Sequence, residues 1–156
     1  MMKELIEIQS KLKAPKGQYN TFGKYKYRSA EDILEAVKPL LAEQKCTVVL
    51  SDDVIAIGNR IYIKTTATLS NADGAEVVST AYAREDETKK GMDGSQITGT
   101  ASSYARKYAL NGLFLIDDTK DAETDEYHKQ NTTAQAQSDA SVELLKQATT
   151  AVNAVK

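Results

Sequence analysis

The 156-residue sequence has no tryptophan, two phenylalanines, one cysteine and one histidine. A single cysteine excludes a disulfide within the chain, and one Cys with one His excludes a zinc cluster built from these residues. Because His128 lies in a polar stretch, no Ser-His-Asp or Cys-His pair has a suitable context. We therefore expect neither a conventional hydrolase nor a metalloenzyme, and we expect Cys46 to be a small buried apolar residue.

Long hydrophobic runs are also lacking. No apolar run approaches the roughly 18 residues that a membrane-spanning helix needs. The N-terminal stretch MMKELIEIQSKLK alternates charged with aliphatic residues, unlike the continuous apolar segment of a secretory signal. We therefore expect a cytoplasmic protein that does not bind membranes. The apolar fraction of 41% is enough for a core, and the chain length suggests one domain with an appendage.

The net charge of −2 hides two regions of opposite sign. Residues 1–116 contain 16 Lys and Arg against 14 Asp and Glu, whereas residues 117–156 contain 4 against 8. We therefore predict a core domain over 1–116 and a flexible acidic linker over 117–156, in which the apolar spacing of 141–155 allows a short helix. Such a tail is either a solvated linker or a segment that binds a partner or competes for a basic surface.

The periodicity of apolar residues predicts an α+β fold. The expected elements, in chain order, are a helix over 2–12, a helix over 29–44, strands over 46–57, 60–70 and 75–86, and a helix from about 95 to 111. Ser29 and Asp32 form a capping box that starts the second helix. Short turns at Gly58-Asn59 and Asn71–Gly74 join the strands into an antiparallel three-stranded meander packed by helices. The segment 13–28 is predicted as a loop, and the run 113–116 is compatible with a short final strand.

The segment Lys89–Leu110, KKGMDGSQITGTASSYARKYAL, combines many small residues with four cations. On a helix, one side carries Ile97, Ala101, Tyr104, Ala105 and Tyr108, which we expect to form the core stripe with partly buried tyrosines. The opposite side carries Gln96, Gly99, Ser103, Arg106 and Lys107. Gly99 costs about 1 kcal/mol relative to alanine inside a helix, which suggests that another helix or a ligand approaches the backbone there.

A phosphate-bearing ligand is one interpretation of this opposite side. The helix N-terminus offers unpaired N–H groups, and the candidate contacts are Lys89, Lys90, Gln96, Ser103, Arg106 and Lys107. The alternative is a solvated face that packs against a neighbour through small residues, and composition favours neither. Because the segment lacks the Gly-Lys-Ser/Thr of a phosphate-binding P-loop, we expect no ATP and no other cofactor.

A second basic and aromatic cluster is KYKYR, residues 24–28. Tyr25 and Tyr27 could stack on bases of a single strand at about 1–3 kcal/mol each, while Lys24, Lys26 and Arg28 hold phosphates. The alternative is an edge strand that places the tyrosines in the core and the three cations in water.

Carboxylates are the remaining catalytic candidates, and they lie in the predicted linker: Asp117, Asp118, Asp121, Glu123 and Asp125. A metal nuclease needs carboxylates that converge from a rigid frame, so we expect no metal site and no enzymatic activity here.

The chain as a whole resembles the Erf (essential recombination function) family of phage single-strand annealing proteins. The resemblance rests on YKYRSAEDILEAVKPLL, TATLSNADG, KKGMDGSQITGTASSYARKYAL and DDTKDAE, and it covers roughly residues 5–125 but not 130–156. One departure is Lys107, where the family often has a second arginine, so that bidentate phosphate geometry is lost.

The resemblance implies an ATP-independent protein, encoded by a phage or prophage, that coats single-stranded DNA and anneals complementary strands in homologous recombination and DNA repair. It also implies a β-β-β-α core and homo-oligomers, as rings or helical filaments. A host single-strand-binding protein and a phage exonuclease are further candidate partners. The alternative function is a non-annealing oligomeric adaptor that recruits another protein through its acidic tail.

Overall fold

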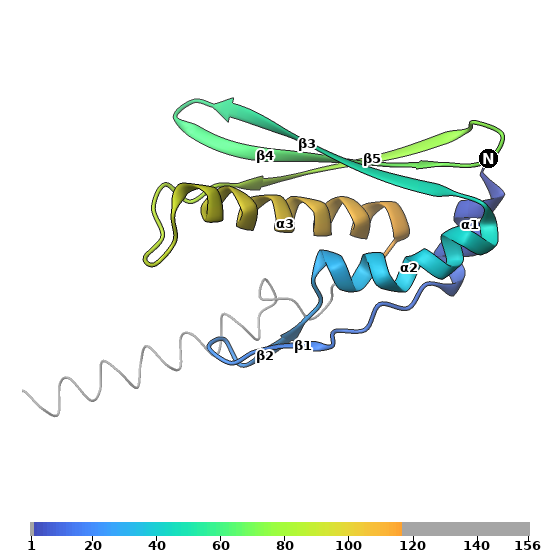
Figure 1. Cartoon of the computed structure of the whole chain (residues 1–156), viewed down its shortest axis with the longest axis horizontal. Helices are drawn as coiled ribbons and strands as arrows, with labels where there is room; N and C mark the ends of the chain where they lie inside the picture. The colour runs from blue at the N-terminus through green and yellow to red at the C-terminus, as the bar shows by residue number, and fades with distance from the viewer. Residues whose placement is uncertain (1, 117–156) are drawn as a thin grey trace, which may run out of the picture. The chain divides into compact units, whose positions relative to one another are not determined.

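The computed structural model describes residues 2–116, and the acidic segment 117–156 with its predicted short helix lies outside the described residues. The elements are α1 (Lys3–Lys11), β1 (Gln18–Asn20), β2 (Tyr25–Tyr27), α2 (Ala30–Gln44), β3 (Thr47–Ile57), β4 (Arg60–Ser70), β5 (Glu76–Arg84) and α3 (Gly94–Phe114). This order confirms the predicted α+β class (Figure 1). No helix among residues 2–116 has both the length and the apolar character needed to cross a bilayer.

Strands β3, β4 and β5 form the predicted antiparallel meander, with β4 in the centre. Ile57 pairs with Arg60 across a two-residue turn whose Gly58 has a φ of 61°, the sign that glycine-first hairpin turns require. The Asn71 side-chain oxygen accepts hydrogen bonds from the backbone N–H groups of Asp73 and Ala75, which closes the second turn. Both predicted turns are therefore confirmed.

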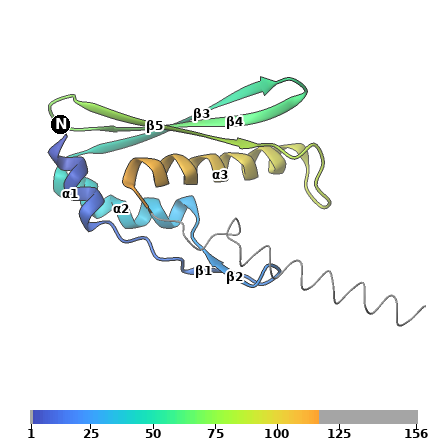
Figure 2. The same cartoon turned by 180° about the vertical axis from the view of Figure 1, so that it is seen from behind.

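Helix α3 covers one face of this sheet, and no described element covers the other face (Figures 1 and 2). Because side chains alternate along a strand, every second residue of β4 faces α3. These buried residues are Ile63, Thr65, Ala67 and Leu69. The sheet and α3 thus form a two-layer unit in which the candidate site residues of α3 lie along the flanks of the helix.

The small residues of α3 explain how closely it lies against the sheet. Ala101, Ala105 and Ala109 are buried at helical spacing, so their methyl groups take the place of bulkier side chains. A Cβ atom added to Gly112 would lie 2.8 Å from the Ser79 hydroxyl oxygen of β5. Close packing on β4 and β5 is therefore the reason for the lack of bulk on this side of the helix.

Helices α1 and α2 pack on the C-terminal half of α3. Ile8, Ile33 and Val37 share one apolar cluster with Leu110 and Phe114 of α3. The same cluster contains Cys46, which is buried as predicted, and burial raises the pKa of its thiol.

The capping box at the start of α2 is confirmed. The Ser29 hydroxyl accepts from the Asp32 N–H, and the Asp32 carboxylate accepts from the Ser29 N–H. The hydrogen bond from the Ser29 backbone holds the pKa of Asp32 below its ordinary value.

Two predictions about local structure are wrong. The final strand over 113–116 does not form, because Leu113 and Phe114 continue the helical spacing of Leu110 and are buried in the core. The predicted loop over 13–28 contains the β1–β2 hairpin, in which Tyr19 pairs with Lys26, so the alternative of a strand within residues 24–28 is confirmed. Its turn is stabilised by the Asn20 side-chain oxygen, which accepts from the N–H groups of residues 22 and 23.

Candidate nucleic-acid interface

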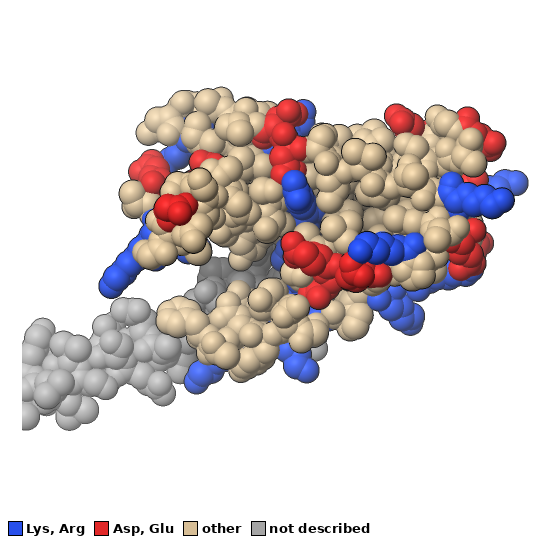
Figure 3. All heavy atoms as spheres, in the orientation of Figure 1, with Lys and Arg blue, Asp and Glu red and all other residues tan. Residues whose placement is uncertain are grey.

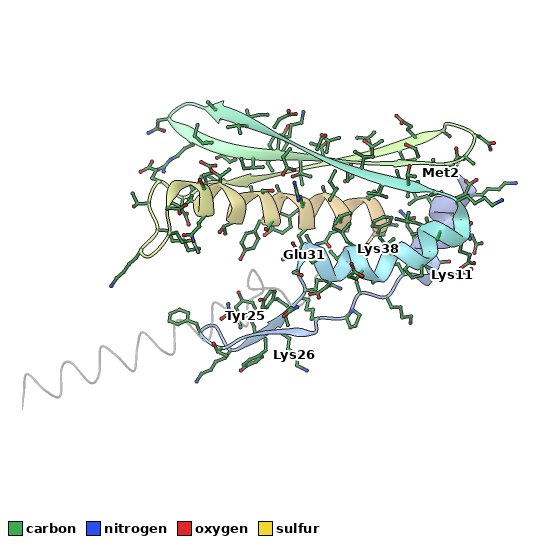
Figure 4. All side chains as sticks on the ribbon, viewed as in Figure 1. Met2, Lys11, Tyr25, Lys26, Glu31 and Lys38 are labelled. Atoms are coloured by element: carbon green, nitrogen blue, oxygen red, sulfur yellow. The ribbon has the colours of Figure 1, made fainter. Side chains whose placement is uncertain are left out.

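The β1–β2 hairpin carries the first group of predicted DNA-binding residues. Lys24 and Lys26 are exposed, and Tyr25 and Lys26 extend to opposite sides of the hairpin (Figure 4). Tyr25 and Tyr27 are half-buried and meet edge to face, with ring centroids 6.2 Å apart. The lysines are therefore accessible to phosphate, whereas each ring already has an aromatic neighbour.

Arg28 differs from the two lysines because it is only 7% exposed. Its guanidinium donates a hydrogen bond to the backbone carbonyl of Ala14, which ties the hairpin to the preceding segment. The expectation that all three cations of this segment lie in water is therefore wrong for Arg28. A phosphate could reach its guanidinium only if the side chain left this buried position.

The N-terminus of α3 was predicted to offer unpaired N–H groups to a phosphate. Instead, the Asp93 carboxylate accepts the Gln96 N–H at 2.9 Å, and the Gln96 side-chain oxygen accepts the Asp93 N–H at 3.0 Å. This capping box uses the carboxylate as the anion of the helix terminus. Gln96 thus has a structural role that its spacing from Asp93 could have indicated, and the terminus itself is a poor phosphate site.

Lys89 and Lys90 lie in the loop between β5 and α3, and both are exposed. The Met92 N–H donates to the Lys89 carbonyl at 3.0 Å, and Gly91 takes a φ of 81° within this turn. The turn presents both lysines to solvent just before α3 begins.

One side of α3, which we call the β3 flank, carries Ser102 and Arg106 and faces Asp52 of β3. The Arg106 Nε and Nη2 atoms each lie 2.9 Å from Asp52 Oδ2, and the Ser102 hydroxyl donates to the same oxygen at 2.6 Å. Thr65 of β4 donates to the other carboxylate oxygen at 2.6 Å. The cation on which the phosphate-binding prediction most depended is therefore paired with a carboxylate.

The protonation of Asp52 reflects these contacts. Burial alone would raise the pKa of this carboxyl, because its side chain is only 21% exposed. The hydrogen bonds from Ser102 and Thr65, together with the charge of Arg106, outweigh burial and hold the pKa below its ordinary value. Asp52 is thus an anion at neutral pH, and the strand pattern could have singled it out as a polar residue on an otherwise apolar face.

The remaining predicted contacts on this side are less constrained. Ser103 is exposed, and a Cβ atom added to Gly99 would meet nothing within 4 Å. Within residues 2–116, no element approaches the backbone at Gly99, so the proposed close approach there stays a prediction.

Tyr104, Lys107 and Tyr108 form a cluster in which the tyrosines are partly buried, as predicted, whereas Lys107 is buried and not solvent-facing. The tyrosines are 47% and 36% exposed, whereas Lys107 is only 8% exposed. The Lys107 Nζ atom lies 5.5 Å from the Tyr104 ring centroid and 5.2 Å from that of Tyr108, within cation–π range. Alanines occupy the buried side of the helix, and both tyrosine rings lie next to the Lys107 ammonium.

The other side of α3, which we call the β5 flank, borders a hollow of about 230 Å³. The lining residues are Arg84, Asp86 and Lys89 from the end of β5 and the following loop, and Ile97, Thr100, Ala101 and Tyr104 from α3. Of these, only Lys89 was a predicted site residue. The i, i+3, i+7 spacing of Ile97, Thr100 and Tyr104 could have indicated a shared flank, but the residues from β5 could not be paired with it from sequence.

Positive and negative charges are interspersed on one face of the molecule. On the face shown in Figure 3, Lys and Arg are separated by Asp, Glu and uncharged residues. Within residues 2–116, no group of His, Cys, Asp and Glu could hold a metal ion. The carboxylates of 117–125 lie outside the described residues, so the nuclease alternative is not addressed by this part of the chain.

Comparison with known proteins relates this chain to one protein family. The sequence profile of the family described as the ERF superfamily matches residues 1–150, which extends the resemblance beyond residue 125 and corrects its expected limit. The chain is 58% identical over 132 residues to the protein named "Essential recombination function protein" from Salmonella phage P22. That alignment covers 85% of this chain and 63% of the relative. No solved structure matches the chain. The extent of the profile match shows that this chain belongs to the ERF superfamily.

Proposed function

We propose that this protein acts in phage recombination as an ATP-independent single-stranded DNA-binding protein that anneals complementary strands. The superfamily and the name of the phage P22 relative support the recombination role. The observation that carries the DNA-binding role is the meeting of cations with exposed aromatic rings on the β5 flank of α3. Arg84 and Lys89 line the same hollow as Tyr104, which is half-exposed. Cations that hold phosphates beside rings that stack on bases are the combination used by single-strand binding grooves.

Annealing by such a surface needs no catalytic residue. Lys and Arg side chains neutralise two strands that otherwise repel each other, and they release condensed counterions as they do so. Base pairing then supplies about 1.4 kcal/mol per stacked step. The protein has to hold the backbones while the register search proceeds, which accounts for a site made of charge and rings alone.

Assembly into a homo-oligomer, as a ring or a helical filament, is part of the proposal. The core domain carries an excess of only two positive charges, so one subunit holds few phosphates. Several linked subunits raise the effective concentration of binding sites along one strand. Within residues 2–116, β3 and β5 pair on one side only, and such open edges can accept a strand from another subunit. Binding to a host single-strand-binding protein or a phage exonuclease stays a prediction.

Annealing of two complementary oligonucleotides labelled with a fluorescent donor and acceptor tests this function. In the absence of ATP, the protein should accelerate the rise of energy transfer at low salt, and the acceleration should fade as salt increases. A pair of non-complementary oligonucleotides is the control for mere co-aggregation. Binding without acceleration would reduce the function to strand coating, and the absence of both would exclude it.

A further inference from the structure

The hollow on the β5 flank has a lining that points to one kind of ligand. We propose that it binds a single nucleotide unit of a DNA strand, with Arg84 and Lys89 on the phosphodiester and Tyr104 stacked on the base. This inference rests on the proposed function, and it places one step of strand recognition between the end of β5 and the first three turns of α3.

The size of the hollow fits one unit of a polymer. Pockets that enclose drug-sized molecules typically measure about 300–1,000 Å³, and this one measures about 230 Å³. A free dinucleotide or a nucleoside triphosphate would extend well beyond it. A strand needs only one base and one phosphate in the hollow, because its neighbouring units continue over the surface outside.

The charge of the lining also fits a phosphodiester. Lys89 and Arg84, the last residue of β5, contribute two positive charges at the hollow and Asp86 one negative charge, which leaves a balance of +1. Strand alternation starts the Arg84 side chain on the face of β5 opposite to α3, so it serves the hollow from the edge of the strand. Within residues 2–116, neither Arg84 nor Lys89 forms an ion pair, whereas the nearby Arg60 is paired with Glu87 at 2.5 Å. A single phosphodiester charge therefore matches the site, and the Asp86 carboxylate disfavours a triphosphate.

The walls supplied by α3 suit a base. Ile97 and Ala101 are apolar, and the Tyr104 ring is 47% exposed although Tyr108 and Lys107 are its neighbours. The Thr100 hydroxyl donates to the Gln96 carbonyl at 2.9 Å, so toward a base it can act only as an acceptor. Stacking on a tyrosine is tolerant of sequence, as a protein that pairs arbitrary complementary strands requires.

The test is a fluorescence anisotropy titration of a fluorescein-labelled oligothymidylate with the full chain at several salt concentrations. Loss of one stacked base in Tyr104→Ala should weaken binding about fivefold to 150-fold, and Tyr104→Phe should keep near wild-type affinity. Arg84→Gln and Lys89→Gln should each lower the slope of log affinity against log salt by about 0.7, because each removes one phosphate contact. Tyr82→Ala, at an exposed tyrosine of β5 that does not line the hollow, and Arg60→Gln, in its ion pair, are the matched controls.

The outcomes separate this inference from the proposed function. Failure of the wild-type protein to bind the oligonucleotide at low salt would remove both. The nucleotide site alone would be overturned if the wild-type protein binds but the variants match their controls. In that case Tyr104→Ala would have the same affinity as Tyr82→Ala, and Arg84→Gln the same salt slope as Arg60→Gln. If Tyr104→Ala does not fold, photocrosslinking of wild-type protein to an oligonucleotide containing 5-iododeoxyuridine decides. Mass spectrometry should then find the crosslink on Tyr104, and crosslinks found only on other peptides would overturn the site.

Discussion

The two flanks of α3 differ in which elements supply their cations and in what those cations face. On the β3 flank, Arg106 and Ser102 converge on the Asp52 carboxylate, so the positive charge of the helix is neutralised within the domain. On the β5 flank, Arg84 and Lys89 line a hollow beside an exposed tyrosine ring. The charge pattern of a helix therefore does not reveal which cation is available to a ligand, because an acidic residue on a neighbouring strand can pair with it first.

The variant with the largest expected effect should disturb the packing of α3 on the sheet and therefore both flanks. Gly112→Val places a branched side chain where even a Cβ would lie 2.8 Å from the Ser79 oxygen, so α3 must shift away from β5. Overpacking of this kind costs about 1–3 kcal/mol, and we expect about 2 kcal/mol lower free energy of unfolding in urea titrations. Gly99→Val is the matched control, since a Cβ there meets nothing within 4 Å. Equal losses in the two variants would show that α3 does not pack as closely as described.

A variant with a smaller expected effect should make the cation of the β3 flank available to a ligand, like the cations of the β5 flank. Asp52→Asn keeps the shape of the side chain but removes the charge that pairs with Arg106. We expect a loss of about 1–2 kcal/mol in the free energy of unfolding, because charged hydrogen bonds become neutral ones. We also expect tighter binding of single-stranded DNA, with a salt slope steeper by about 0.7, because Arg106 becomes available to phosphate.

Asp53→Asn is the control for this change, since it removes the same charge from the adjacent residue, which points to the opposite face of the sheet. The difference between the two variants therefore reports the pairing with Arg106 and not net charge. A salt slope that rises equally in both would show that Arg106 stays unavailable to DNA.

The same carboxylate predicts a dependence of stability on pH. The pKa of Asp52 is lower in the folded protein than the value of about 3.9 expected in the unfolded chain. Its contribution is therefore fully present above about pH 5 and is lost as the pH falls through the folded-state pKa. The difference in unfolding free energy between wild type and Asp52→Asn, measured by urea titration, should be constant from pH 7 to about 5 and shrink below about 4.

Comparison with the Asp52→Asn variant is needed because Asp32 also has a lowered pKa and shifts wild-type stability in the same direction. A difference that does not change down to about pH 3 would mean that Asp52 is not held as an anion by its three partners.

Local signals were sufficient to predict the framework of this fold. The two turns follow from glycine and asparagine chemistry, and the start of α2 follows from a serine and an aspartate three residues apart. Period-two alternation placed the buried residues of β4 on one face. Each of these signals lies within a few residues of sequence, so no knowledge of tertiary packing was needed.

The candidate site could be predicted only in part, because its geometry depends on contacts between distant segments. Asp52 and Arg106 are 54 positions apart, and helical spacing of α3 alone cannot show that they meet. The same limit made Lys107 look solvent-facing, although Tyr104 and Tyr108 cover it. The helical pattern assigns the partly buried rings to the core stripe because the sequence does not show that alanines and Gly112 already fill the interface with the sheet.

The variant with the smallest expected effect is Gly99→Ala, and it tests whether a partner approaches α3 near the β3 flank. Alanine at this exposed helical position should raise the free energy of unfolding by up to about 1 kcal/mol, since the added methyl group meets nothing and the unfolded chain loses freedom. If the glycine serves an approaching strand or subunit, Gly99→Ala should be more stable and yet anneal oligonucleotides more slowly, while Ser103→Ala keeps the wild-type rate. Greater stability with unchanged annealing would show that no strand or subunit approaches the backbone at Gly99, because a close contact there would be blocked by the added methyl group. Close approach of a partner to α3 would then be left to the β5 flank.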